Sequence, residues 1–161
     1  MAIYLVRHGA NLPAHVDPDK GLSEEGRKEV ERVAASAGGY ALELASIRHS
    51  GKKRAYETAR ILESALKSRE GVQEMSGLGP NDDFSRLAAT MDRYENTMFV
   101  GHLPFMERLL AGLVDRSPEI PAVRFRTGQV VCLEKDSQSG SWVIQWVLTP
   151  DGNQEPLQSH Q

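Results

Sequence analysis

Short apolar segments that alternate with amphipathic segments constrain the fold of this chain more than any other feature of its sequence. Three apolar segments have the length and composition of buried strands, and they span 2–6, roughly 42–47 and 97–100. An amphipathic helix is expected after each strand: the first follows the cap Ser23 and ends at Gly38-Gly39, the second carries Ala55 to Leu66, and the third carries Phe105 to Leu113. Strands joined through helices pair in parallel, and the helices cover both faces of the sheet. We therefore expect an α/β fold, a three-layer α/β/α sandwich with a mostly parallel central sheet.

The last part of the chain departs from this alternation and predicts a β-hairpin. Two β-rich segments span 129–134 and 142–148, and the polar residues 136–140 separate them. Trp142 and Trp146 lie four residues apart in the second segment. Because side chains alternate along a strand, both indoles are expected on one face of the sheet.

Length and charge exclude several classes of protein. The 161 residues suffice for one domain, which we place at 1–150, followed by a frayed polar tail over 151–161. The net charge is −3, from 19 basic and 22 acidic residues, so the basic excess typical of nucleic-acid binders is missing. No apolar run has the length of a membrane span, and no signal peptide is recognisable. We expect a cytoplasmic protein that binds neither nucleic acid nor a membrane.

The cysteine and the histidines give no sign of a metal site. Cys132 is the one cysteine, and it lies in an apolar alternation, which favours a small buried side chain over a nucleophile. The histidines include no close helical pair of the His-x-x-x-His kind, and no cysteine cluster accompanies them; they are His8, His15, His49, His102 and His160. We therefore expect neither a bound metal nor another cofactor.

Charged and polar side chains follow each of the three predicted strands. Arg7 and His8 come after the first strand; taken alone, they are equally well explained as a strand-end ion pair and hydrogen bond. Ser50 follows the second strand with Arg54 one helical turn farther on, and His102 follows the third. The carboxyl ends of parallel strands share one edge of a sheet, so these side chains are expected to lie together. Two guanidinium groups and two imidazoles repel one another unless an anion joins them, so the sequence predicts a site for a phosphoryl group.

Four segments around these residues form an ordered set of motifs. They are Arg7-His8-Gly9, Leu22-Ser23-Glu24-Glu25-Gly26, the S-x-x-x-R-A-x-x-T-A pattern over 50–59, and Gly101-His102. Together they resemble the motifs of the histidine phosphatase superfamily, the phosphoglycerate mutase-like or branch 1 group. The matches run from about residue 3 to 114 in the family's order, so the set is far more specific than any one motif. The short chain and the segment Gly101-His102-Leu103-Pro104 narrow the resemblance to SixA-type phosphohistidine phosphatases.

The resemblance implies a role for each residue of the expected site. By this likeness His8 is the nucleophile that becomes phosphorylated, and His102, Arg7 and Arg54 complete the catalytic set. The implied phosphate-binding residues are Arg7, His8, Gly9, Ser50, Arg54 and His102. Cations around the oxygens stabilise phosphoryl transfer without a metal, and a protonated His102 is expected to be one of them. His8 has to attack while neutral, and a nearby backbone carbonyl would hold it in the required tautomer.

The chain departs from the family where a strong general acid is expected. Ala10 stands where mutase members have Glu or Gln, and Leu103 stands where branch 2 acid phosphatases have Asp. An imidazole leaving group can be protonated by solvent and departs more readily than an alkoxide, so these departures favour a phosphoramidate substrate. Three carboxylates near the expected pocket rim are candidate proton donors, namely Glu74, Asp82 and Asp83. For Asp82 and Asp83, capping of a helix that carries Phe84 to Met91 is the favoured explanation.

These observations predict a metal-independent phosphatase that removes phosphate from phosphohistidine on a signalling or phosphocarrier protein. The reaction would pass through a phosphohistidine on the enzyme, and water would then release inorganic phosphate. A short chain leaves few residues for a lid over a small ligand, which favours a protein substrate. Two alternatives stay open: a small-molecule phosphomonoesterase with Glu74, Asp82 or Asp83 as its acid, and a phosphoprotein-binding module with negligible turnover.

Overall fold

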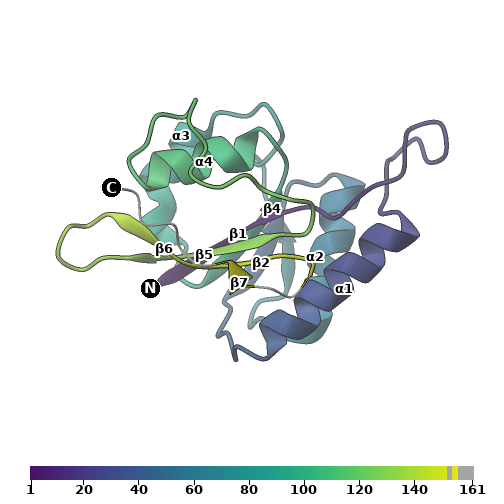
Figure 1. The fold of residues 1–161 in the computed structure, drawn as a ribbon, viewed down its shortest axis with the longest axis horizontal. Helices are drawn as coiled ribbons and strands as arrows, with labels where there is room; N and C mark the ends of the chain where they lie inside the picture. Colours follow the sequence, from purple (N-terminus) through teal and green to yellow (C-terminus); the bar gives the residue numbers. More distant parts are fainter. Residues whose placement is uncertain (152–153, 156–161) are drawn as a thin grey trace.

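A seven-stranded mixed sheet forms the centre of the structure, a computed structural model that describes residues 1–151 and 154–155 (Figure 1). Its strands are β1 (Ala2–Arg7), β2 (Ser46–His49), β3 (Val72–Glu74), β4 (Thr97–Gly101), β5 (Val130–Lys135), β6 (Trp142–Leu148) and β7 (Gln154–Glu155). Their order across the sheet is β3-β2-β4-β1-β5-β6-β7. The strands from β3 to β1 pair in parallel, whereas β5, β6 and β7 join in the antiparallel sense. The expected parallel sheet and the expected terminal hairpin are both present.

Helices cover both faces of this sheet, as the sequence predicts. They are α1 (Glu24–Gly38), α2 (Lys53–Leu66), α3 (Phe84–Thr90) and α4 (Phe105–Leu113), with a short 3-10 helix, η1 (Met91–Arg93), after α3. Side chains of β1 alternate between the two faces. Tyr4 and Val6 pack on the side of α1 and α2, and Ile3 and Leu5 pack on the side of α3 and α4. The result is a three-layer α/β/α sandwich.

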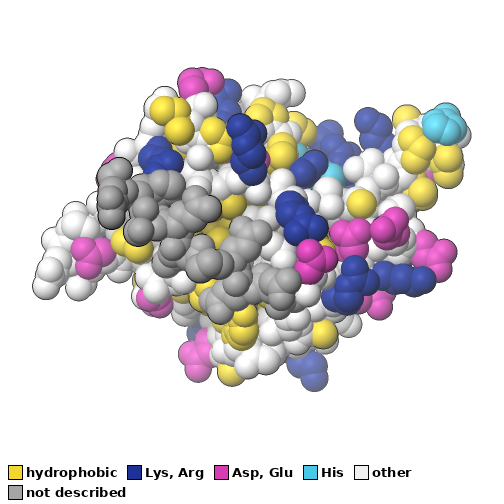
Figure 2. Space-filling view, viewed as in Figure 1, with side chains coloured by type: hydrophobic (Ala, Val, Ile, Leu, Met, Phe, Trp, Pro, Cys, Tyr) yellow, Lys and Arg dark blue, Asp and Glu magenta, His cyan; other side chains and the backbone are white. Residues whose placement is uncertain are grey.

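The sequence of α1 explains how this helix sits on the sheet. Ser23 caps it, because the Ser23 side chain accepts a hydrogen bond of 3.0 Å from the amide of Gly26. Val30 and Val33 lie on the stripe that is buried against the sheet. Acidic and basic side chains are mixed on the opposite, exposed side, which Figure 2 shows in space-filling form. Burial of one apolar stripe therefore fixes the orientation of α1.

The second strand begins later than the sequence predicts. β2 starts at Ser46, and the preceding residues 42–45 are not part of the sheet. The cause is the register with β4, in which Ser46 pairs with Thr97, the first residue of that strand. Leu44 is nevertheless buried in the core, which accounts for the apolar pattern before β2. The edge strand β3 was not expected, because three residues are too few to show a periodicity.

The two tryptophans lie on opposite faces of the sheet, and the prediction that they share a face is wrong. Trp142 packs on the side of α3 and α4, whereas Trp146 packs on the side of α1 and α2. The register between β5 and β6 shifts between Cys132 and Leu133, and this bulge reverses the direction of the side chains beyond it. Cys132 is buried, as expected, and burial raises the pKa of its thiol to about 12.

The predicted frayed tail is only partly within the described residues. Residues 154–155 form β7, which pairs with Val147 and Leu148. The other tail residues beyond Asp151, at 152–153 and 156–161, lie outside the described part of the chain. In the part that is described, no helix has the length and hydrophobicity that crossing a membrane requires.

Candidate active site

Two histidines lie next to each other at the carboxyl edge of the parallel strands. His8 follows β1 and His102 follows β4, and the His8 amide donates a hydrogen bond of 3.0 Å to the carbonyl oxygen of Gly101. The centroids of the two imidazole rings are 5.0 Å apart. Both residues are buried: His8 is 7% exposed and His102 is 1% exposed. The two histidines therefore lie together at the strand ends, as the sequence predicts.

The imidazole of His8 is held in the tautomer that a nucleophile needs. Its Nδ1 donates a hydrogen bond of 2.7 Å to the carbonyl oxygen of Gly9, which leaves a lone pair on Nε2. Burial lowers the pKa of His8 to about 4, and the charges of Arg54 and Arg7 act in the same direction against the opposing effect of the Gly9 carbonyl. His8 is therefore neutral near pH 7, with Nε2 able to attack.

Gly9 joins neighbouring elements through its amide and through close packing. Its amide donates to Thr58 Oγ1 at 2.9 Å, and that hydroxyl donates to the carbonyl oxygen of Arg54 at 2.8 Å. A Cβ at Gly9 would lie 2.6 Å from Cγ2 of Val30, so a larger residue would force α1 away from β1. Thr58, which sequence analysis did not single out, occupies the threonine position of the motif over 50–59. The amide of Gly9 is thus already used in joining β1 to α2.

Among the described residues, the imidazole of His102 forms a hydrogen bond with Ser50 alone. The Nε2 atom of His102 lies 2.6 Å from Oγ of Ser50, and the Lys52 amide donates to the same Oγ at 3.4 Å. The Nδ1 atom of His102 is buried and has no partner among the described residues. Burial lowers the pKa of His102 to about 3, with further lowering by His8, Arg54 and Lys52. The expectation of a protonated His102 is therefore wrong for the structure as it stands, because burial and neighbouring basic groups favour the neutral imidazole.

The two arginines are held in different ways. Nη1 of Arg7 donates to the carbonyl oxygen of Phe125 at 2.9 Å, and the Phe125 amide donates to the carboxylate of Glu107, also at 2.9 Å. Arg54 lies in the first turn of α2, is half-buried, and has no side-chain hydrogen bond or ion pair within the described residues. Burial lowers the pKa of both guanidinium groups, which nevertheless stay charged. Sequence analysis missed Phe125 and Glu107, because contacts through a backbone carbonyl and amide leave no motif.

The three candidate proton donors lie in different settings. Asp83 caps α3 by accepting a hydrogen bond of 3.0 Å from a backbone amide in the first turn, which confirms the capping explanation. Asp82 accepts from the Gly79 amide at 2.7 Å and so stabilises the loop before α3 without capping it. Glu74 is exposed at the end of β3, and its Cδ would lie 2.9 Å from a Cβ placed on Gly51. Glu74 is thus the one of the three that lies beside Gly51.

The remaining described histidines make other contacts. His49 is buried in β2, and its Nδ1 accepts a hydrogen bond of 3.1 Å from the amide of Gly51. His15 is exposed in the loop between β1 and α1. No group of three or more His, Cys, Asp or Glu side chains in the described part of the chain is arranged to hold a metal ion.

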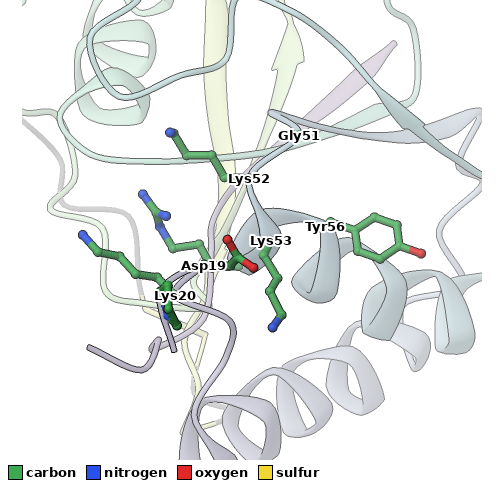
Figure 3. A pocket seen from close by; sticks show the side chains of 8 residues that line it. Asp19, Lys20, Gly51, Lys52, Lys53 and Tyr56 are labelled. Carbon is green, nitrogen blue, oxygen red and sulfur yellow. The ribbon is translucent and has the colours of Figure 1, made fainter. Parts of the chain in front are cut away.

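An open pocket of about 660 Å³ lies beside the start of α2 (Figure 3). It is lined by Pro18, Asp19, Lys20, Gly51, Lys52, Lys53, Arg54 and Tyr56. Its residues come from the loop between β1 and α1 and from the segment that joins β2 to α2. Neither histidine lines the pocket, but Gly51, which does, directly follows Ser50, the hydrogen-bond partner of His102.

Residues 3–79, which contain Arg7, His8 and Arg54, match the sequence model of the histidine phosphatase superfamily (branch 1). Over these residues the chain matches this superfamily, in agreement with the resemblance of its motifs. The matched residues include the first three of the four motifs that predict a phosphatase. Comparison with curated proteins gives no significant match.

Solved structures extend the likeness to nearly the whole chain. The protein histidine phosphatase SixA in complex with tungstate is 23% identical, with a TM-score of 0.80 over 94% of this chain and 98% of that one. A structure from Agrobacterium tumefaciens, assigned as a SixA phosphohistidine phosphatase, is 25% identical, with a TM-score of 0.75 over 92% and 97%. A structure from Escherichia coli assigned as an alpha-ribazole-5'-phosphate phosphatase is 17% identical, with a TM-score of 0.71 over 90% and 95%. The phosphoglycerate mutase-like fold is thereby confirmed.

Proposed function

We propose that this protein removes phosphate from phosphohistidine on a signalling or phosphocarrier protein, with His8 as the nucleophile. The observation that carries the proposal is the sign of the charges that shift the pKa values of His8 and His102. Arg54 and Arg7 lower the pKa of His8, and His8, Arg54 and Lys52 lower that of His102. Each of these groups is basic, and no carboxylate is among them. This setting suits an imidazole leaving group, which solvent can protonate, better than an alkoxide, which needs a strong acid beside it.

The phosphoryl oxygens would be held by three donors. Arg7 and Arg54 supply fixed positive charge, and the guanidinium of Arg54 is not engaged by any described side chain. His102 would donate through its unpartnered Nδ1 while neutral. For this, the single ring proton of neutral His102 has to be on Nδ1, which leaves Nε2 as an acceptor. The Ser50 hydroxyl accepts a hydrogen bond from the Lys52 amide and can donate its own proton to Nε2. We infer that Ser50 is a positioning residue that acts through His102.

Two in-line transfers would complete the reaction. In the first, the Nε2 lone pair of His8 forms a bond to phosphorus while the bond from phosphorus to the substrate imidazole breaks, and the departing nitrogen takes a proton from solvent. In the second, a water oxygen bonds to phosphorus, the bond to His8 breaks, and inorganic phosphate leaves. The hydrogen bond from Nδ1 to the Gly9 carbonyl keeps Nε2 as the atom that attacks in the first transfer and leaves in the second.

Two of the structural neighbours support a protein substrate, since they are named a protein histidine phosphatase and a phosphohistidine phosphatase. Other neighbours carry small-molecule names, among them a phosphoserine phosphatase from Entamoeba histolytica, 15% identical with a TM-score of 0.69 over 91% of this chain and 95% of that one. The likeness of fold is compatible with either class of substrate. The charges around His8 and His102 are the reason to prefer phosphohistidine.

A substrate comparison tests the proposal. The purified protein is offered a phosphohistidine protein, free phosphohistidine and a panel of phosphate esters, each with a chelator present, and released phosphate is measured. We expect the phosphohistidine protein to have the highest kcat/KM and the chelator to have no effect. Faster turnover of an ordinary ester would instead support a phosphomonoesterase, for which the exposed Glu74 beside Gly51, a residue that lines the pocket, is a candidate acid. Tight binding of the phosphoprotein without phosphate release would identify a binding module.

A further inference from the structure

The pocket beside Arg54 contains two lysine side chains, Lys20 and Lys52, that are not among the proposed phosphoryl ligands. Figure 3 shows the ammonium groups of Lys20 and Lys52 on the same side of this pocket. Both residues are exposed, and within the described part of the chain neither side chain takes part in a hydrogen bond or an ion pair. The chain as a whole has a net charge of −3, so the positive charge of this lysine pair is opposite in sign to the net charge of the chain. Together they raise the positive potential directly beside the proposed phosphoryl site.

The carboxylate of Asp17 forms an ion pair with a third lysine, Lys53. Nζ of Lys53 lies 2.9 Å from the carboxylate of Asp17, and this hydrogen bond is the main reason that the pKa of Lys53 is raised. Asp19, which also lines the pocket, contributes to the same rise. Lys20 and Lys52 therefore keep their charge available for a partner molecule.

Asp17 also holds the loop that carries Lys20. Its carboxylate accepts hydrogen bonds from the amides of Asp19, at 3.1 Å, and Gly21, at 2.9 Å, in addition to its bond with Lys53. Lys20 lies between these two amides with a left-handed backbone, φ 52°, where glycine or asparagine is less strained.

An exposed aromatic ring lies on the opposite side of the pocket from the two lysines (Figure 3). Tyr56 is 45% exposed, and it packs edge-on against His49 with 5.3 Å between the ring centroids. Tyrosine is enriched where proteins bind each other, whereas small ligands are held in enclosed sites with converging polar groups. An open pocket with a supported ring and two unpaired cations therefore fits a protein surface better than a small anion.

We propose that Lys20 and Lys52 form a docking subsite for acidic side chains that flank the phosphohistidine of a protein substrate, with Tyr56 as an apolar contact. The inference rests on the proposed function, because the phosphoryl group of the same substrate has to reach His8. Complementary charge of this kind raises the rate of encounter and selects among partners. The subsite would thus distinguish phosphohistidine proteins by the acidity of the surface around the modified residue.

Two phosphohistidine peptides test this subsite. They share one sequence except for the residues that flank the phosphohistidine, which are glutamates in one peptide and glutamines in the other. We expect the protein to hydrolyse the glutamate peptide with a kcat/KM about tenfold higher. The preference should shrink when the ionic strength is raised from about 0.02 M to about 0.5 M, because salt screens exposed charges. The double variant Lys20→Asn, Lys52→Gln should lose the preference.

The chain offers a matched control for that variant. Lys67 is also exposed and has almost the same left-handed backbone, φ 51°, but it ends α2 at the far end from the pocket. Lys28 is an exposed lysine of α1 and does not line the pocket. The double variant Lys67→Asn, Lys28→Gln removes the same charge and asparagine suits the backbone at Lys67. It should keep the full preference for the glutamate peptide.

The outcomes separate the docking inference from the proposed function. Equal hydrolysis of both peptides by the unmodified protein would overturn the subsite and leave the proposed function standing. An equal loss on both peptides in the Lys20→Asn, Lys52→Gln variant would show that these charges act on the phosphoryl group itself, which also overturns the subsite. Failure to hydrolyse either peptide, with turnover of phosphate esters, would overturn both proposals together.

Discussion

Ser50 and His102 are 52 positions apart in the sequence, and a hydrogen bond of 2.6 Å joins Oγ of Ser50 to Nε2 of His102. The contact exists because Ser50 follows β2 and His102 follows β4, and these strands are parallel neighbours. Since the Lys52 amide donates to the same Oγ, the serine proton is free to go to Nε2. The proton of a neutral His102 then belongs on Nδ1, the atom that has no partner among the described residues.

Replacement of Ser50 tests this assignment of the proton. In Ser50→Ala, Nε2 of His102 loses its donor and the tautomer is no longer fixed, so we expect kcat for phosphohistidine to fall about tenfold, which corresponds to one hydrogen bond. Nitrogen chemical shifts of His102 should indicate the Nδ1–H tautomer in the unmodified protein and a mixture in the variant. Ser50→Thr retains a hydroxyl and should restore both the rate and the shifts. An Nε2–H tautomer in the unmodified protein would contradict the role given to Ser50.

Covalent chemistry at His8 is open to direct observation. Because Nε2 of His8 is proposed as the nucleophile, rapid quenching during turnover should trap acid-labile phosphate on this residue. His8→Ala should abolish both trapping and turnover, whereas replacement of the exposed His15 by alanine should change neither. Undiminished turnover in His8→Ala would rule out the proposed mechanism.

The free energy of unfolding should depend on pH through the buried histidines. The pKa of His8 is lowered to about 4 and that of His102 to about 3, both from 6.5. As the pH falls below about 6.5 the unfolded chain binds protons that the folded chain does not bind, so the stability falls until the folded pKa values are reached. Each histidine contributes a slope that approaches about 1.4 kcal/mol per pH unit. Urea denaturation at pH 7.5 and at pH 5 measures the loss.

A double variant isolates this effect from the rest of the chain. His8→Asn, His102→Asn removes two of the three buried histidines whose pKa burial lowers and leaves His49, so its stability should change less between the two pH values than that of the unmodified protein. His15→Asn provides the control, because His15 is exposed in a loop. The same pH dependence in the double variant would mean that other groups are responsible.

The carboxylates around the site are expected to be dispensable for phosphohistidine. Single amide variants of Glu74, Asp82 and Asp83 should retain turnover of phosphohistidine within about tenfold, since solvent can protonate the leaving imidazole. Asp83→Asn should also retain the stability of α3, because asparagine caps a helix about as well as aspartate. A loss of about 10² to 10⁴ in any one of them is the size expected for an essential general acid, and it would move the assignment to a phosphomonoesterase.

Local pattern was sufficient for much of the fold and for the choice of site residues. The apolar strands and amphipathic helices have periods that depend on near neighbours in sequence, and they predicted the layers of the sandwich. Parallel pairing then requires that the strand ends lie at one edge, so the meeting of His8 with His102 followed from the order of the elements. Prediction failed where the cause was distant in sequence, as at the bulge between Cys132 and Leu133 that separates Trp142 from Trp146.

The sequence by itself determined which chemical groups reach the site, whereas only the tertiary structure decided their protonation and their partners. The neutral state of His8 and His102 comes from burial by elements far apart in the chain, and no motif records the loss of solvent. In the same way, Gly9 donates its amide to Thr58 and Arg7 bonds to the Phe125 carbonyl because of how the helices and loops pack on β1. The physical reason is that desolvation and hydrogen bonding depend on distances in space, which a linear pattern constrains only between neighbours.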